Sequence, residues 1–141
     1  MIIGAHTLAF HGHARATNYV DIWVRQDLDN SLRLSEALRE FGAAISEEDA
    51  KRFAEPSRHM IRLGVPPTMV DILNFAGEES FEQVWSGRIQ GTLLDVSVHF
   101  PSRTALIQMK RAAGRPQDLV DIAKLEQLGE HSSRTESDES Q

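Results

Sequence analysis

Short runs of apolar residues alternate along the chain with segments in which apolar residues recur at helical spacing. The apolar runs predict strands at residues 1–3, 20–24, 59–63, 69–75 and 92–98. Helical spacing and capping residues predict helices at residues 4–10, 30–41, 80–85, 101–113 and 116–128. Strands and helices in this order favour an α+β fold, with a small mixed β-sheet flanked by helices and a helix pair at the C-terminal end.

Two local signals support these elements. The helix expected at residues 30–41 has the clearest amphipathic pattern, and Gly42 is expected to end it. Its apolar side is formed by Leu32, Leu34, Ala37, Leu38 and Phe41. Farther along, Pro66 and Pro67 separate two predicted strands, and proline cannot continue a strand ladder. These two strands are therefore expected to form a hairpin.

The length of 141 residues leaves room for one domain with a single core, which we place at residues 1–128. Hydrophobic residues make up 40% of the chain and charged residues 26%, an ordinary balance for a globular protein. No apolar run reaches the roughly 20 residues that cross a bilayer, and no secretory signal is evident. Because the sequence also lacks cysteine, it predicts a cytoplasmic protein without a membrane-spanning helix.

The net charge of −6 is unevenly distributed. Residues 130–141 hold four acidic residues and one arginine, and so contribute −3 of this charge. The rest of the chain, at about −3, is not a general nucleic-acid binder, so binding to a nucleic acid would need a local basic patch. Because the Ser- and Glu-rich end lacks apolar periodicity, residues 129–141 are expected to be a disordered acidic tail.

Two aspartates, Asp21 and Asp71, each lie inside an otherwise apolar predicted strand. A carboxylate in such a setting is costly unless it is paired, hydrogen-bonded or bound to a cation. If both point to the same face of the sheet, they fit a Mg²⁺ site, since this ion is usually held by one or two carboxylates together with substrate phosphates. The alternative is that each stands at a strand end, exposed or bonded to a loop amide.

Two other groups of potential metal ligands are better explained without a metal ion. Asp27 and Asp29 precede the amphipathic helix, where acids cap the chain and favour the helix N-terminus. His6, His11 and His13 form a histidine cluster, but no third ligand stands at a standard zinc spacing. We expect these histidines to lie in a loop and at helix ends.

A dense group of charged residues spans the turn between the last two predicted helices. Lys110 ends one helix and Arg115 lies in the turn. Asp118 and Asp121 stand in the first turns of the next helix. The structural interpretation pairs these aspartates with Lys110 and Arg115. The functional interpretation gives Lys110 a triphosphate to bind, and both interpretations can hold for one motif.

Six short segments within residues 1–128 carry a resemblance to a known family. They are Ile3-Gly4-Ala5, Phe10-His11-Gly12, Arg15-Ala16-Thr17, Val20-Asp21-Ile22-Trp23-Val24, Val70-Asp71-Ile72-Leu73 and the stretch from Lys110 to Asp121. In combination they resemble small prokaryotic nucleotidyltransferases of the DNA polymerase β-like superfamily, of the minimal nucleotidyltransferase or toxin–antitoxin type. The Arg-x-Thr entry to the acidic strand and the Gly-Arg-Pro-Gln-Asp-Leu-x-Asp corner are the most specific segments.

The resemblance implies roles for particular residues. Gly4 and Ala5 would form the phosphate-binding turn. Thr17 and Lys110 would be further nucleotide contacts. Asp21 would hold the metal ion, Mg²⁺ or Mn²⁺, and Asp71 would be a second ligand that helps to activate the attacking hydroxyl. The implied reaction is transfer of a nucleoside monophosphate from an NTP by in-line displacement at the α-phosphate.

Two positions depart from the family pattern. Ala5 replaces the usual second glycine or serine, which removes any serine hydroxyl but keeps the backbone contact. Tyr19 replaces the first aspartate, which in this family bridges both metal ions. A phenol offers one neutral oxygen at neutral pH and cannot take that role. The expected catalysis is therefore weakened or lost.

The sequence leaves three functions open. The first is an active nucleotidyltransferase that modifies RNA, a protein or a small molecule. The second is a catalytically inactive relative that keeps nucleotide binding and serves as the antitoxin or scaffold subunit of a two-component system. The third is a protein-interaction module whose carboxylates are structural. The partner would be another subunit or a second copy of the chain, because an open edge strand favours dimerisation.

Overall fold

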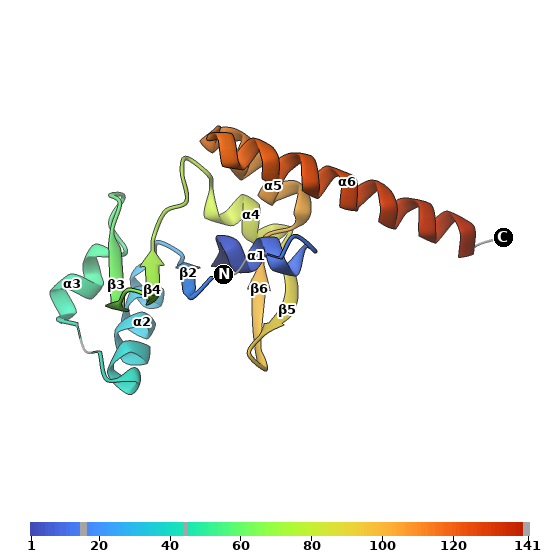
Figure 1. Cartoon of the computed structure of the whole chain (residues 1–141). Coiled ribbons are helices and arrows are strands. Elements are labelled where there is room, and N and C mark those ends of the chain that lie inside the picture. The colour runs from blue at the N-terminus through green and yellow to red at the C-terminus, as the bar shows by residue number, and fades with distance from the viewer. Residues whose placement is uncertain (15–16, 44, 140–141) are drawn as a thin grey trace.

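The computed structural model describes residues 1–14, 17–43 and 45–139, and it confirms the predicted α+β fold (Figure 1). Its strands are β1 (Ile2–Ile3), β2 (Tyr19–Trp23), β3 (Met60–Val65), β4 (Thr68–Leu73), β5 (Ile89–Leu93) and β6 (Val96–Phe100). Its helices are α1 (Ala5–Phe10), α2 (Leu28–Phe41), α3 (Glu47–Arg52), α4 (Phe81–Ser86), α5 (Arg103–Ala113) and α6 (Pro116–Glu139). None of the helices in the described part of the chain is both long and apolar enough to span a membrane.

Four strands form one mixed sheet in the order β1-β2-β4-β3. The strands β3 and β4 make the predicted antiparallel hairpin, with Pro66 and Pro67 between them. The strands β2 and β4 are parallel neighbours, so the segment between them, which carries α2, α3 and β3, is a crossover connection. This parallel pairing places Asp21 directly beside Asp71, the arrangement on which the candidate site depends.

The helix α2 and the segment that follows it pack on one face of the sheet. The buried apolar residues there are Leu38, Phe53 and Ile72. The buried row of α2 also contains Ser31 and Ser35, seven and three residues before Leu38 along the same face. Leu32 and Phe41 are 41% and 72% exposed and Ala37 is also exposed, so the predicted apolar side of this helix was wrong at those three positions.

A second core forms where α1, α5 and α6 meet. Its buried members are Leu8, Leu106 and Leu125. The predicted helix pair is confirmed, with the Ser102 hydroxyl accepting a bond from the Ala105 N–H at the start of α5 and Gly114 ending that helix. Phe10 stacks on Phe100 with 4.3 Å between the ring centroids, which joins α1 to β6.

Two segments differ from their sequence predictions. The single strand expected at residues 92–98 is a hairpin, because the chain reverses at Leu94 and Asp95, which have φ angles of 48° and 66°. A two-residue loop with both φ angles positive is a type I′ turn, and this one is hidden inside an apolar run. The stretch 129–139 also differs from the disordered tail expected for residues 129–141, since α6 continues to Glu139.

Candidate functional site

Asp21 and Asp71 lie side by side on the parallel strands β2 and β4. Paired positions in adjacent strands project from the same face of a sheet, and Tyr19, two residues before Asp21, shares that face. Burial, followed by the charge of Asp71, raises the pKa of the Asp21 carboxyl above its ordinary value. The fold therefore juxtaposes the two predicted acids around a partly buried negative charge, which a cation would stabilise.

The carboxylate of Asp71 is bound by an arginine. Arg62 lies opposite Asp71 on the antiparallel strand β3. Its Nε and Nη2 donate to Oδ1 and Oδ2 of Asp71 at 2.8 and 2.9 Å. These hydrogen bonds are the first cause of an Asp71 pKa below the ordinary value. Sequence reasoning missed Arg62. The predicted hairpin places Arg62 and Asp71 on neighbouring strands, but the register that pairs these two positions depends on the turn geometry.

Gly4 packs directly on the Asp21 carboxylate. Its φ of 76° and ψ of −151° belong to a backbone region that is essentially restricted to glycine. A Cβ atom at this position would overlap Oδ2 of Asp21. Ala5, the second residue of the predicted phosphate-binding turn, begins α1. The absence of a side chain at Gly4 thus lets the backbone of the predicted phosphate-binding turn lie close to Asp21, the predicted metal ligand.

A pocket of about 240 Å³ connects this turn with Lys110. It is lined by Gly4, Ala5, Leu8, Lys110, Arg115, Gln117 and Asp118. The Lys110 ammonium donates to Asp118 Oδ1 at 3.4 Å and to Asp121 Oδ2 at 3.0 Å. Arg115 donates to Asp118 through Nε at 2.7 Å, and this bond is the first cause of a lowered Asp118 pKa. The ion pairs predicted for this corner are confirmed, and the phosphate contact of Lys110 stays a prediction.

Thr17 lies at the entry to β2. Its Oγ1 accepts a hydrogen bond from the Tyr19 N–H at 3.0 Å, so the side chain holds the backbone where the strand begins. Arg15 and Ala16, the other two residues of the predicted entry motif, lie outside the described residues. The nucleotide contact predicted for Thr17 stays a prediction.

His11, His13 and Asp27 have structural partners. His11 donates from Nε2 to the Pro101 carbonyl oxygen at 2.8 Å, and burial is the first cause of a lowered His11 pKa. His13 Nε2 lies 3.2 Å from Oδ1 of Asp121. Asp27 caps α2 by accepting from the Asn30 N–H at 2.7 Å, as the sequence predicts.

The Asp21–Asp71 pair fits one divalent cation better than two. A single Mg²⁺ needs only one or two carboxylates when substrate phosphates complete its shell. Two adjacent ions would need a bridging carboxylate at Tyr19 and unoccupied oxygens on Asp71, but Arg62 uses both of those oxygens. Among the described residues, no three His, Cys, Asp or Glu side chains gather in a metal-binding arrangement, and the magnesium site stays a prediction.

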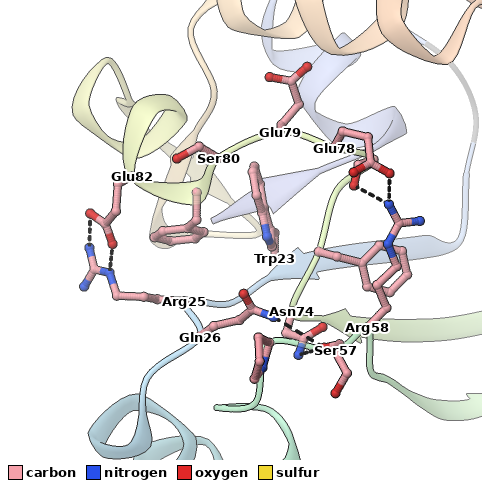
Figure 2. A pocket seen from close by; sticks show the side chains of 14 residues that line it. Trp23, Arg25, Gln26, Ser57, Arg58, Asn74, Glu78, Glu79, Ser80 and Glu82 are labelled. Atoms are coloured by element: carbon pink, nitrogen blue, oxygen red, sulfur yellow. Dashed lines mark hydrogen bonds and ion pairs between the residues drawn. The ribbon is translucent and has the colours of Figure 1, made fainter.

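A second pocket, here called the aromatic pocket, has a volume of about 400 Å³ and opens at the C-terminal ends of β2 and β4 (Figure 2). Figure 2 shows Trp23 between two ion pairs, Arg25 with Glu82 and Arg58 with Glu78. Trp23 is 1% exposed, and its Nε1–H has no acceptor among the described residues. The pocket is thus lined by two ion pairs and a third carboxylate, Glu79, beside the buried Trp23.

The walls of the aromatic pocket are held by specific hydrogen bonds. Asn74 donates from Nδ2 to the carbonyl oxygens of Phe53 and Ser57, at 3.3 and 2.9 Å. Its Oδ1 accepts from the His59 N–H at 2.8 Å. Residues 77–79 also line a neighbouring pocket of about 310 Å³, whose lining includes Gly4 and Lys110. Sequence reasoning missed the aromatic pocket because its residues come from separate segments with no shared motif.

Comparisons with known proteins leave the family open. A scan with family models finds none that matches the chain, and a comparison with curated proteins finds no match either.

Proposed function

We propose that the chain is a nucleotidyltransferase-like protein that binds a metal–NTP complex at Asp21 and Asp71 and transfers a nucleoside monophosphate from it. The observation that carries this proposal is the pairing of Asp21 with Asp71, with Gly4 packed against Asp21. When bound, Mg²⁺ or Mn²⁺ would supply Lewis acidity at the reacting phosphate. The residues themselves provide two adjacent carboxylates and a close backbone approach.

The neighbouring side chains support nucleotide binding at this place. Lys110 lines the same pocket as Gly4 and Ala5, and its two bonds to Asp118 and Asp121 leave one of three ammonium donors for a phosphate oxygen. Asp71 is kept ionised by Arg62, so it can accept a hydrogen bond from an attacking hydroxyl and orient it. Each of these roles uses a group that is already held in position.

The aromatic pocket favours a small acceptor over a long polyanion. It shares residues 77–79 with the pocket that contains Gly4 and Lys110, and Trp23 is two residues beyond Asp21 on one strand face. Its two arginines are each paired with a glutamate, so they offer no net positive charge to a nucleic acid. We place in this pocket a small hydroxyl compound, or a single side chain of a protein, as the acceptor.

A second candidate is an inactive relative that binds nucleotide without turning it over. Two observations favour it. Tyr19 presents a phenol where the reaction needs a third carboxylate, and Arg62 occupies both oxygens of Asp71. Such a protein would act as a nucleotide-binding or protein-interaction subunit, for example in a toxin–antitoxin system.

The test follows transfer of α-phosphate label from the four NTPs with Mg²⁺ or Mn²⁺, offering RNA, the protein itself and small hydroxyl compounds as acceptors. The wild type, Tyr19→Asp and Asp21→Asn are compared. Label transfer by the wild type that Asp21→Asn abolishes supports the active enzyme, and the labelled product names the acceptor. Transfer by Tyr19→Asp alone supports the inactive relative. Absence of both transfer and nucleotide binding in the wild type contradicts both candidates.

A further inference from the structure

Arg62 sits where the Asp21–Asp71 pair would otherwise draw a positive ion. We propose that the Arg62 guanidinium takes the place of one divalent cation at this pair, so that the wild-type chain does not bind free Mg²⁺ there. The inference rests on the proposed function only for the location of the site. Its test uses metal ions without nucleotide, so the two proposals can fail separately.

The geometry is that of a dedicated counter-ion. Arg62 and Asp71 occupy paired positions on β3 and β4, so the register of the hairpin delivers the guanidinium to the carboxylate. Both oxygens of Asp71 accept, at 2.8 and 2.9 Å from two different guanidinium nitrogens. This bidentate arrangement is the strong form of an arginine–carboxylate pair, and a metal ion at either oxygen would lie beside the positive charge of the guanidinium.

The surroundings extend the role of Arg62 beyond Asp71. The hydrogen bond to Asp71 is the first cause of a raised Arg62 pKa, and the charge of Asp21 adds to it. His6 and, after it, Arg62 oppose the rise in the Asp21 pKa that burial and Asp71 cause. The guanidinium therefore acts on both carboxylates, as a bridging cation would.

The net charge at the Asp21–Asp71 pair determines how strongly it attracts a metal ion. Two ionised aspartates and one arginine leave a net charge of −1 at the pair, whereas removal of the arginine charge leaves −2. A free divalent ion is attracted much more strongly to the second arrangement, and it also finds the Asp71 oxygens unoccupied. With Arg62 in place, a metal ion would reach Asp21 together with nucleotide phosphates, which contribute the missing oxygens.

The experiment measures Mn²⁺ affinity and the metal dependence of thermal unfolding for wild type and Arg62→Gln. We expect Arg62→Gln to unfold at a lower temperature in a chelator, to regain stability in Mg²⁺ or Mn²⁺, and to bind Mn²⁺ at least about tenfold more tightly than wild type. The double variant Arg62→Gln/Asp71→Asn should lose this gain. The matched control is Arg111→Gln, which breaks the exposed ion pair between Arg111 and Glu126 on α5 and α6 and should bring no metal response.

Three results would overturn the proposal. Wild type binding Mn²⁺ as tightly as Arg62→Gln would show that the guanidinium does not exclude the ion. An unchanged Mn²⁺ affinity after Asp71→Asn in the Arg62→Gln background would place the ion elsewhere. A metal response of Arg111→Gln equal to that of Arg62→Gln would make the effect general. If Arg62→Gln does not fold, Arg62→Met keeps the length of the apolar stem and supplies the same comparison.

Discussion

Gly4 and Asp21 lie against one another, with Oδ2 of Asp21 in the space that a side chain at position 4 would fill. The contact joins the start of α1 to the middle of β2, two segments that the sequence keeps well apart. It fixes where the half-buried carboxylate lies relative to the pocket that contains Lys110. The stability of this part of the fold therefore depends on one glycine, and so would the proposed binding of a nucleotide.

Replacing Gly4 with alanine should destabilise the protein strongly. The backbone conformation alone costs about 1–3 kcal/mol for a residue with a side chain, and the added Cβ would also displace the Asp21 carboxylate. The control is Gly42→Ala at the end of α2, where φ is also positive but no atom lies within 4 Å of the added Cβ. Chemical denaturation should show a clearly larger loss for Gly4→Ala, and equal losses would contradict the close contact.

Asp21→Asn should raise the free energy of unfolding at neutral pH. Because the pKa of Asp21 is raised in the folded protein, its ionised form is disfavoured there, and its contribution to stability is lost as the pH rises through the folded pKa. The gain should therefore be largest at neutral pH and should disappear as the pH falls toward the ordinary value of 3.8. Thermal unfolding across this pH range measures the difference between variant and wild type.

Asp71→Asn should change the free energy of unfolding in the opposite direction to Asp21→Asn. The pKa of Asp71 is lowered by Arg62, so its ionised form contributes stability above the ordinary pKa and loses it as the pH falls through the folded pKa. The variant should be less stable than wild type at neutral pH, with a deficit that shrinks in acid. Effects of the same sign for Asp21→Asn and Asp71→Asn would show that the two carboxylates have similar environments, contrary to the structure.

Lys110→Met should destabilise the corner between α5 and α6 by about 3–5 kcal/mol, the usual cost of removing one partner from a buried ion pair. The Lys110 side chain is 14% exposed and bonds to Asp118 and Asp121, whose side chains are 2% and 0% exposed. The control Lys124→Met, at an exposed position on α6, should change stability by less than about 0.5 kcal/mol. If Lys110→Met folds with wild-type stability, the ion pairs of Lys110 do not stabilise the corner, and nucleotide binding would be the only role left for this lysine.

Leu94→Asn should stabilise the β5–β6 hairpin by roughly 0.5–1 kcal/mol, because asparagine tolerates the positive φ of a type I′ turn better than leucine does. Leu94 is 89% exposed, so little buried apolar surface is lost. The exposed Leu119→Asn on α6 lacks this advantage and should lower stability. Denaturant midpoints of the two variants measure the difference, and a destabilised Leu94→Asn would contradict the turn.

The sequence was sufficient for features that depend on local chemistry. The caps at Asp27 and Gly42, the hairpin around the prolines and the pairing of Lys110 with Asp118 and Asp121 all follow from residue type and short spacing. The turn at Leu94 and Asp95 was missed because leucine is not typical of a type I′ turn and Asp95 stands at the second position, where glycine is usual. The buried serines of α2 were missed because a count of apolar residues cannot register a polar residue that faces the core.

In the candidate site, too, local chemistry could be predicted and long-range geometry could not. Asp21 and Asp71 could be chosen from the sequence because a carboxylate within an apolar strand is unusual, but their parallel pairing comes from the crossover of the chain. Arg62 and the aromatic pocket depend on strand register and on side chains from segments distant in sequence. Long-range geometry of this kind leaves no periodic signal along the chain.

The central claim is that a metal–nucleotide complex binds beside Gly4, Asp21 and Asp71. Its most direct test records the amide NMR spectrum of the isotope-labelled protein with a non-hydrolysable NTP, and compares a small fraction of Mn²⁺ with Mg²⁺. Paramagnetic Mn²⁺ broadens the signals of nearby amides. We predict that those of Gly4, Asp21 and Asp71 broaden first and that Asp21→Asn prevents it. Broadening centred on other acidic residues, or no broadening at all in the presence of nucleotide, would contradict the claim.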